Sequence, residues 1–388
     1  MKEQLLFLSA HLPAPNASEA GQVCAFHNLK LLSEKFDVHL VAFRTEVSRD
    51  WSSEPVEQLC ASSKFFSATY FGRARSALCN PTLPTKAAAR ATSTCAAYIS
   101  ALIQKHNFGR VHLEGQQMTV YANIFKHIPK RTLYAQDVFC QTFERKAEKY
   151  SFPANIFYAV ERHRMQRWER SAFNKMTHLY VPSEKDVELV RQLDASLTAR
   201  TKSIPLFFKE YGARETVPDG RPALVFWGAY SRSENVDAAK FLVDEILPHL
   251  RVSGCNAKVI LAGANPPQSF NSFDPANVVV TDFVADPGIE LRSATIAVLP
   301  LRMGGGVKVK VLELLAVGVP VVTTLVGAEG IPCESSDGLI IATMDAGDIA
   351  RKAAEILSLP PDQLLTLSKA AADWARRYAK TGGAAILS

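Results

Sequence analysis

The chain has 388 residues, of which 47% are hydrophobic and 21% charged, and its formal net charge is +6. This length favours two domains of roughly 150 to 200 residues each. No apolar stretch approaches the roughly 18 residues of a membrane-spanning helix, so the composition excludes helical spans and indicates a soluble globular protein. The seven cysteines are scattered and form no CxxC pair, so we expect reduced thiols, a cytoplasmic protein and no zinc site.

Positive charge is concentrated in the first half of the chain. Residues 1–206 contain 27 Lys and Arg against 18 Asp and Glu, whereas residues 207–388 contain 17 against 20. The first half is therefore the part expected to meet an anionic surface or ligand, although a solvated basic surface without a partner explains the same counts. No RNA- or DNA-binding motif accompanies the charge, so no nucleic-acid partner is expected.

The first apolar run, LLFLSA at residues 5–10, predicts a buried strand. It is too short for a secretory signal peptide, and Glu3 makes its flank too acidic. Further apolar runs alternate with helical patterns, which predicts α/β construction with a mostly parallel sheet. The predicted strands of this half are 5–10, 37–43, 65–71, 110–115, 131–136 and 177–182, and the predicted helices are roughly 18–35, 85–105, 116–127, 154–175 and 184–194.

Residues 208–222, FKEYGARETVPDGRP, lose this periodicity and gather Gly, Pro and charges, which predicts a linker. A second α/β series follows. Its strands are predicted at 223–229, 258–263, 277–284, 295–300, 319–324 and 338–343, and its helices at 235–250, 287–293, 306–317 and 346 to about 380. We therefore predict two Rossmann-like doubly wound domains facing each other across a cleft, with ligands at the carboxyl ends of the strands.

The most unusual stretch is RMGGGVKVKVLELLAVG at residues 302–318, which places three glycines at a strand-to-helix turn. Free amides and the positive end of the helix dipole can bind a phosphate there, and glycines let it reach the backbone. A tight turn without a ligand would have the same composition, and neither GxxxxGK[ST] nor GxGxxG is matched. Glu313, on the second turn of the helix, could accept a pair of hydroxyl hydrogen bonds from a ribose diol, although many helical glutamates have no such role.

The segment PLRMGGGVKVKVLELLAVGVPVVTTLVGAEGI (300–331) resembles the nucleotide-sugar signature of the large retaining glycosyltransferase family 4, the glycosyl transferases group 1. In the second half, FWGAYSRSENVDAAKFLVDEILPHL, KVILAGANPP and VVVTDFVADP agree in order and spacing, and in the first half PAPNASEAGQVCAFHNLKLLSEKFDVHLVAF and YVPSEKD also fit. The resemblance implies the GT-B fold, in which residues 1–206 bind the acceptor, residues 207–361 bind the donor, and helices in 362–388 cross back to the first domain.

In function, the resemblance implies a retaining glycosyltransferase of the hexosyltransferase type, which moves a sugar from a nucleotide-diphosphate sugar to a glycan or lipid-linked acceptor. No D-x-D occurs in the chain, so we expect no divalent metal and no cofactor other than the donor substrate. A GT-B nucleotide-sugar epimerase and a non-catalytic nucleotide-sugar-binding subunit remain as alternatives.

The resemblance also implies roles for individual residues. Glu313 matches the second glutamate of the family's E-x7-E motif, which binds the donor ribose, whereas Gly305 stands where the first glutamate belongs. The contact of that first glutamate with the donor sugar would pass to the amides of the glycine loop. The family's diphosphate-binding lysine, seven residues after Gly228, is Asn235 here. The expected donor-binding residues are Gly21, Gly228, Asn235, Arg302, Gly304, Gly305, Gly306, Lys310 and Glu313.

Lys308 is the first choice to neutralise the leaving diphosphate, because its predicted place is the first turn of the helix that follows the glycines, and Arg232 is a second candidate. Glu114 and Asp137 end two predicted strands of the first domain. Glu114 occupies roughly the place of a sugar-contacting histidine in the family, so both carboxylates are candidates for catalytic roles, although structural roles explain them equally well.

The basic stripe VERHRMQRWERSAFNK at residues 160–175 surrounds apolar side chains with four arginines and one histidine. Such a stripe could rest on anionic lipid headgroups at the inner face of a membrane, where lipid-linked acceptors reside. A helix with a solvated basic face is the alternative, since Glu161 and Glu169 lie at helical spacings from the arginines.

Overall fold

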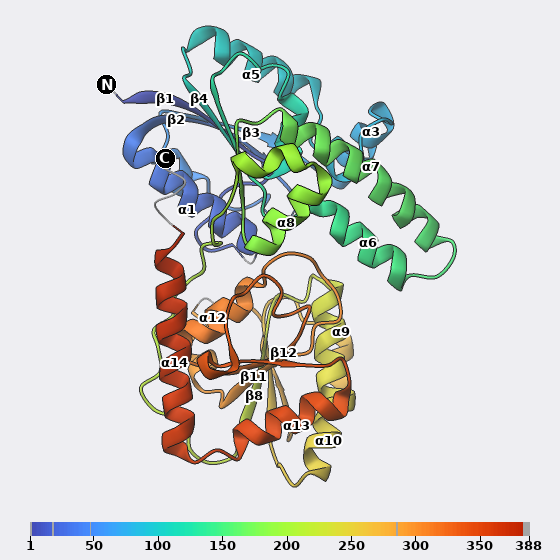
Figure 1. The fold of residues 1–388 in the computed structure, drawn as a ribbon, viewed down its shortest axis with the longest axis vertical. Helices are drawn as coiled ribbons and strands as arrows, with labels where there is room; N and C mark the ends of the chain where they lie inside the picture. Colours follow the sequence, from blue (N-terminus) through green and yellow to red (C-terminus); the bar gives the residue numbers. More distant parts are fainter. Residues whose placement is uncertain (1, 18, 47, 285, 383–388) are drawn as a thin grey trace. The chain divides into compact units, whose positions relative to one another are not determined.

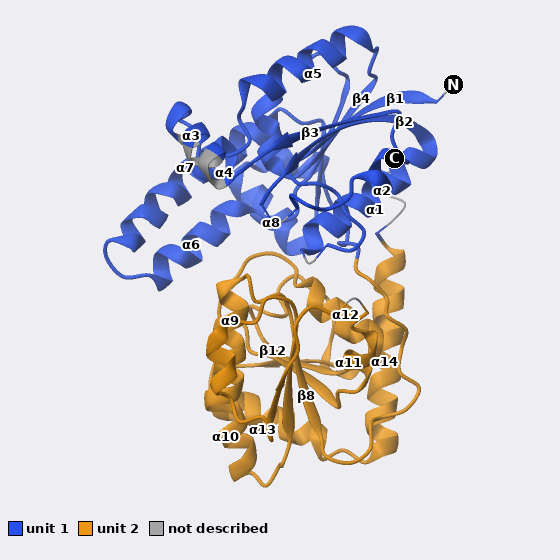
Figure 2. Cartoon of the chain, turned by 180° about the vertical axis from the view of Figure 1, so that it is seen from behind, with its two compact units in different colours: residues 1–207, 382–388 blue, residues 208–381 orange. Residues whose placement is uncertain are grey.

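The computed structural model describes residues 2–17, 19–46, 48–284 and 286–382. The chain divides into two compact units, residues 1–207 with 382–388 and residues 208–381 (Figure 2). Each unit has helices packed around one parallel sheet (Figure 1), which confirms the predicted pair of Rossmann-like α/β domains. In the described part of the chain, no helix combines the length and the apolar character that crossing a bilayer requires.

The sheet of unit 1 has seven parallel strands in the order β3-β2-β1-β4-β5-β6-β7. Side chains of β1 (Glu3–Ser9) alternate between two cores: Leu6 and Leu8 pack on one side of the sheet, and Leu5 and Phe7 on the other. Burial on both faces explains the continuous apolar run in the sequence. The strands are β1 (Glu3–Ser9), β2 (Phe36–Arg44), β3 (Ser62–Ser67), β4 (Arg110–Glu114), β5 (Lys130–Tyr134), β6 (His178–Val181) and β7 (Thr201–Ser203).

Unit 1 contains more helices than the sequence predicts. The helix expected at 85–105 is interrupted, because Thr92 leaves the helical conformation and its hydroxyl caps the next helix by accepting from the Cys95 amide. Thr69 likewise ends the strand region expected to reach residue 71 and caps a helix there. The helices are α1 (Ala20–Lys35), α2 (Glu54–Glu57), α3 (Tyr70–Cys79), α4 (Thr85–Ala88), α5 (Ser93–Lys105), α6 (Phe139–Lys149), α7 (Ala154–Asn174) and α8 (Glu184–Leu193), with 3-10 turns at Gln116–Tyr121 and Ala195–Arg200.

The sheet of unit 2 has six parallel strands in the order β10-β9-β8-β11-β12-β13. All six correspond to predicted strands, and residues 208–222 form no helix or strand, as the linker prediction requires. The strands are β8 (Ala223–Trp227), β9 (Lys258–Ala262), β10 (Val278–Val280), β11 (Ile296–Leu299), β12 (Val321–Thr324) and β13 (Leu339–Ala342). The helices are α9 (Ser233–Phe241), α10 (Leu247–Val252), α11 (Gly288–Arg292), α12 (Val309–Val317), α13 (Ala346–Leu357) and α14 (Pro361–Lys380), with a π-helical segment at Leu242–Ile246 and 3-10 turns at Gln268–Ser272 and Ser335–Asp337.

Two helices of unit 2 differ from their predicted form. The helix expected at 235–250 widens into the π-helical segment just before α10, where Pro248 supplies no backbone N–H. The helix α12 begins three residues later than expected, because Gly304 and Gly306 have φ values of 121° and 69°, outside the helical region.

The last long helix, α14, lies within unit 2 and packs against α12. At their contact Gly318 ends α12 with a φ of 82°, and a Cβ on Gly318 would lie 2.9 Å from the carbonyl oxygen of Ser368. The helices of residues 362–388 were expected to cross back to the first domain, and residues 383–388 of that segment lie outside the described residues.

Candidate functional site

The glycine loop, residues 300–308, connects β11 to α12 at the carboxyl end of the sheet of unit 2. Gly304 and Gly306 adopt positive φ, which other residues rarely do. Lys308 is the N-cap residue of α12 and makes no side-chain capping bond. The start of α12 therefore presents backbone amides and the positive dipole end without a capping side chain from its N-cap, as an anion site requires.

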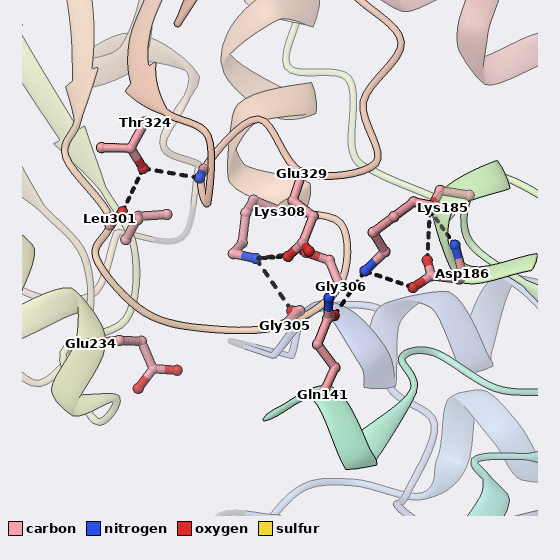
Figure 3. Close-up of polar contacts among 12 residues, drawn as sticks. Gln141, Lys185, Asp186, Glu234, Leu301, Gly305, Gly306, Lys308, Thr324 and Glu329 are labelled. Carbon is pink, nitrogen blue, oxygen red and sulfur yellow. Dashed lines mark hydrogen bonds and ion pairs between the residues drawn. The ribbon is translucent and has the colours of Figure 1, made fainter. Parts of the chain in front are cut away.

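Lys308 turns back over the glycine loop (Figure 3). Its Nζ donates to the carbonyl oxygen of Gly306 at 2.6 Å and to that of Gly305 at 3.3 Å. The carboxylate of Glu329 lies 3.8 Å from the same nitrogen, and the two side chains are only 11% and 8% exposed. The structure thus places Lys308 at the N-cap rather than in the first helical turn, with its charge partly balanced by Glu329.

Hydroxyls of β12 hold the start of the glycine loop. Thr323 donates to the carbonyl oxygen of Leu299 at 2.6 Å, and Thr324 donates to that of Leu301 (Figure 3). The Thr324 hydroxyl also accepts from the amide of Gly327 at 3.2 Å. These bonds satisfy carbonyl groups just after β11, so the polypeptide leaves the sheet along a fixed path before it reaches the glycines.

Lys310, Asn235 and Gly228 form one cluster at the carboxyl end of β8. The Nζ of Lys310 donates to Oδ1 of Asn235 at 2.5 Å and lies 5.0 Å from the ring centre of Phe226. A Cβ on Gly228 would lie 2.7 Å from that nitrogen, so a side chain there would require Lys310 to move. The pKa of Lys310 is lowered to about 7, mainly by burial and in addition by the positive charges of Arg232 and Lys308.

Glu313 points from α12 toward the end of β8. One of its carboxylate oxygens accepts a hydrogen bond of 2.8 Å from Nε1 of Trp227. Burial raises the pKa of Glu313 to about 7, against the lowering effects of the Trp227 bond and the positive charges of Lys209 and Lys310. A half-buried carboxylate between an indole and two ammonium groups is able to accept hydroxyl hydrogen bonds once it is ionised.

The two predicted arginines of unit 2 have different surroundings. Arg302 donates to both carboxylate oxygens of Asp237, at 3.0 and 2.8 Å, and its guanidinium lies 4.5 Å from the ring centre of Phe241. Arg232 precedes α9, is 54% exposed, and lies 3.9 Å from the carboxylate of Glu234. Arg302 therefore forms a two-bonded ion pair with Asp237, and the ion pair of Arg232 with Glu234 is the weaker of the two.

The first-domain candidates Glu114 and Gly21 lie at the carboxyl ends of strands of unit 1 or beside them. Glu114 is 1% exposed; its Oε1 accepts from Asn28 at 2.7 Å and lies 2.9 Å from Nε2 of His112. A Cβ on Gly21 would lie 2.2 Å from the side-chain oxygen of Gln136. In this structure Glu114 joins β4 to α1, and Gly21 lets α1 approach the residue that follows β5.

Asp137, the remaining first-domain candidate, follows β5 and is half-buried. Its carbonyl oxygen accepts from the side chain of Gln116 at 2.8 Å, and its negative charge raises the pKa of the nearby Glu169. Glu169 is fully buried and accepts from the amides of Phe139 and Cys140 at 2.7 and 3.0 Å. Asp137 thus lies beside a structural carboxylate at the start of α6.

The basic stripe of residues 160–175 forms most of α7. Its residues Met165 and Phe173 are fully buried in unit 1. Glu161 forms an ion pair with Arg164, whereas Glu169 binds backbone amides instead of an arginine. Met165 and Phe173 are therefore packed within the fold, whereas Val160, the first residue of the stripe, is 53% exposed beside the exposed basic residues.

Three residues around the candidate site are missed by the sequence reasoning: Trp227, Lys209 and Glu329. Trp227 directly precedes Gly228 at the end of a predicted strand, and that position was a usable signal. Lys209 lies in the predicted linker and Glu329 in a turn after β12, where nothing in the local pattern indicates which side chain reaches the site. Across the described ranges, no group of three or more His, Cys, Asp and Glu side chains is arranged to hold a metal ion.

Comparison with known proteins gives one family match. Residues 221–359 match the model of the family described as Glycosyl transferases group 1, a segment that contains the glycine loop, Lys308, Lys310 and Glu313. A search of curated protein sequences finds no match. The match lies within residues 207–361, the predicted donor-binding domain, and supports a glycosyltransferase.

Solved structures with the same fold match nearly the whole chain at low identity. Sucrose-phosphate synthase from Thermosynechococcus elongatus has a TM-score of 0.69 and 14% identity, over 99% of this chain and 96% of that one. The Anabaena protein HepE in complex with UDP has a TM-score of 0.67 and 14% identity, over 100% and 97%. WaaG, a glycosyltransferase involved in lipopolysaccharide biosynthesis, has a TM-score of 0.62 and 15% identity, over 97% and 95%. The chain thus has the GT-B fold, and its residues 221–359 match the Glycosyl transferases group 1 family.

Proposed function

We propose that the chain is a glycosyltransferase that moves a sugar from a nucleotide-diphosphate sugar to a glycan or lipid-linked acceptor. The observation that carries the proposal is the arrangement of the glycine loop, the two lysines and Glu313 inside the segment that matches the family model. Structures of HepE with UDP and with UDP-glucose, and of TarM from S. aureus with UDP, support a nucleotide-diphosphate sugar as the donor class.

The donor binds unit 2 in this proposal. Its diphosphate lies against the amides of Gly304, Gly305 and Gly306 and the start of α12, where the helix dipole favours an anion. The ribose hydroxyls donate to Glu313, beside Trp227. Arg232, with only a weak ion pair, is the arginine that turns toward the phosphates, whereas Arg302 continues to hold Asp237.

The chemistry follows from charge. The bond between the anomeric carbon and the phosphate oxygen breaks with its electron pair going to the diphosphate, and the acceptor oxygen bonds to that carbon as it loses its proton. Lys308, Lys310 and the loop amides stabilise the negative charge that develops on the leaving group. The cations of this chain take the place of a divalent metal in this scheme, so transfer proceeds in the presence of a chelator.

Retention of the anomeric configuration is a further part of the proposal, supported by the likeness to family 4. Unit 1 contributes the acceptor contacts, and of its candidates Asp137 has the more exposed carboxylate, whereas Glu114 is bonded to His112 and Asn28. We therefore assign Glu114 a supporting role and Asp137 the sugar-facing one.

A test begins with binding. Thermal unfolding of the full chain is measured against nucleoside diphosphates and nucleotide sugars, with Glu313→Ala as the matched control. A donor that stabilises the chain but not the variant is then incubated with candidate acceptors in the presence and absence of EDTA, and the anomeric configuration of the product is determined by NMR. Failure of every nucleotide to stabilise the chain contradicts the proposal.

A non-catalytic nucleotide-sugar-binding subunit is the second candidate. The observation that favours it is the contact of Lys308 with Glu329, which occupies the cation predicted to act on the leaving group. A subunit of this kind binds the donor but neither transfers its sugar nor hydrolyses it, even slowly. Any turnover that Lys308→Ala abolishes identifies the enzyme.

A further inference from the structure

Two helices of unit 1, α6 and α7, form a hairpin that projects from the sheet (Figure 1, Figure 2). Phe139, Phe143 and Met165 give the hairpin a small core of its own, with Tyr158 and Trp168 packed against it. Because these side chains hold the two helices together, the end of the hairpin keeps its shape without help from the residues exposed there.

Four large apolar side chains are exposed at the end of this hairpin, and we call them the apolar tip. Phe152 is 77% exposed, and Ile156, Phe157 and Val160 are 53%, 52% and 53% exposed. Ile156 and Val160 are four residues apart on α7 and therefore lie on one face of the helix. Single exposed apolar residues are ordinary, but a group of four on a projecting hairpin marks an interaction surface.

The exposed charges next to the apolar tip are mainly positive. Arg162, His163, Arg167 and Arg170 are exposed along α7, following directly after Val160. Residues 139–170 contain seven Lys and Arg against four Glu. Two of those four, Glu161 and Glu169, are buried at 1% and 0% exposure and bonded inside the unit. Glu161 pairs with Arg164, and the exposed Arg162 and Arg170 pair with Glu144 and Asp194. An excess of positive charge therefore remains at the surface of the hairpin.

We propose that the apolar tip inserts into the interfacial region of an anionic lipid bilayer, with the arginines of α7 at the level of the headgroups. Aromatic and aliphatic side chains on a projecting, basic hairpin match the two attractions that bind peripheral proteins to such membranes, apolar burial and charge. The contact lies at residues 152–160, which include only the first residue of the stripe 160–175, because Met165 and Phe173 further along the stripe are buried in unit 1.

The experiment is sedimentation of the full chain with vesicles of phosphatidylcholine, with and without phosphatidylglycerol. We expect the chain to sediment with the anionic vesicles and much less with the neutral ones. The double variant Phe152→Ser/Phe157→Ser is expected to lower the partition coefficient about ten-fold or more, and Arg167→Glu about five-fold or more. Val252→Ser, a substitution at an 88% exposed apolar residue of unit 2, is the matched control and is expected to change nothing.

The outcomes are distinct. No sedimentation with anionic vesicles, or equal sedimentation of the double serine variant, overturns the proposal. A different outcome is that light scattering shows the wild type to be a dimer and the serine variant a monomer, while neither binds vesicles. In that case the apolar tip joins two copies of the chain and the membrane proposal is wrong. Thermal unfolding of each variant confirms that the fold is retained, and the readout does not depend on glycosyl transfer, so the two proposals fail separately.

Discussion

Lys310 donates a hydrogen bond of 2.5 Å to the side chain of Asn235, and this bond links α12 to α9 across the carboxyl end of β8. Asn235 stands at the position where the family resemblance places a phosphate-binding lysine. The ammonium group of Lys310, which is 75 residues further along the chain and belongs to α12, thus reaches the same place from another helix. The position retains a cation, although the residue predicted to carry it has changed.

The buried ammonium of Lys310 should leave a signature in the pH dependence of stability. Its pKa is lowered to about 7 from the ordinary value of 10.5 by burial, so the unfolded chain binds one more proton than the folded chain between pH 7 and pH 10.5. Wild-type stability therefore gains from this group as the pH rises through that window. Apart from an offset that does not depend on pH, Lys310→Met should be more stable than the wild type at pH 6 by roughly 1–3 kcal/mol. This difference in the free energy of unfolding should shrink toward pH 10.

The measurement is urea unfolding at several pH values, and the informative quantity is the change in the difference between variant and wild type. Asn235 loses its donor in the variant at every pH, which adds a constant offset. Lys240→Met, on the exposed side of α9, is the control and should show no such change. A difference that stays flat from pH 6 to pH 10 contradicts the lowered pKa of Lys310.

Glu313 should show the opposite dependence. Burial raises its pKa from 4.5 to about 7, so the folded chain holds a proton that the unfolded chain releases, and wild-type stability falls as the pH rises from about 4.5 to 7. The glutamine of Glu313→Gln cannot ionise. The free energy of unfolding of this variant should therefore exceed that of the wild type by roughly 1–3 kcal/mol at pH 8, with little difference at pH 5. Urea unfolding at the two pH values measures it, with Glu355→Gln, 60% exposed, as control.

The same variant should bind a nucleotide-diphosphate sugar more weakly. Glutamine offers one acceptor oxygen where the carboxylate offers two, and the charge that strengthens a hydroxyl hydrogen bond is gone. A variant that is more stable at pH 8 and yet binds the donor as tightly as the wild type would show that Glu313 does not contact the donor.

Lys308→Ala should lower glycosyl transfer by about 10² or more, since it removes one charge-stabilising donor from the leaving group. Initial rates at saturating donor measure the effect. The matched variant Glu329→Gln removes the acidic partner 3.8 Å away but keeps the ammonium group, and its rate should change by less than about ten-fold. Equal losses in the two variants would assign the pair to loop structure rather than to the leaving group.

Most strands of the two sheets could be predicted from the sequence because they are buried and appear as apolar runs, whereas β7, with the sequence TKS, has no apolar run and was not predicted. The prediction fails where a single side chain determines where a helix begins. Thr92 divides a long helical pattern by capping α5, and α6 is missed because its first-turn amides are satisfied by the carboxylate of Glu169, which is 30 residues away along the chain. Contacts of that range leave no local periodicity in the sequence.

The candidate site could be predicted in part. The glycines, Lys308, Lys310 and Glu313 lie within ten residues of one another, so their motif can be recognised in the sequence, and in the structure they lie around the start of α12. Trp227 and Glu329 reach the site from other strand ends, which only the order of strands in the sheet reveals. Arg302 resembled a phosphate ligand in the sequence, but its geometry toward Asp237 depends on α9 and could not be inferred.

Glu169 should be essential for the position of α6. Its two carboxylate oxygens accept the amides of Phe139 and Cys140, and Glu169→Ala leaves these buried donors without partners. We expect a loss of roughly 2–4 kcal/mol in the free energy of unfolding and faster hydrogen exchange across residues 139–149. Glu148→Ala, an exposed position on the same helix, is the control. Unchanged exchange in α6 would contradict the capping role of Glu169.

The contact of α12 with α14 provides the last prediction, because two glycines of unit 2 share a backbone conformation but not their surroundings. Gly318 and Gly254 have φ values of 82° and 83°. A Cβ on Gly318 would lie 2.9 Å from the carbonyl oxygen of Ser368, whereas nothing lies within 4 Å of a Cβ on Gly254. Gly254→Ala should cost about 1 kcal/mol for the left-handed conformation alone. Gly318→Ala should cost about 2–4 kcal/mol, because α14 must also move away from α12. Urea unfolding of the two variants isolates the packing contribution as their difference, and equal costs would mean that α14 adjusts without strain.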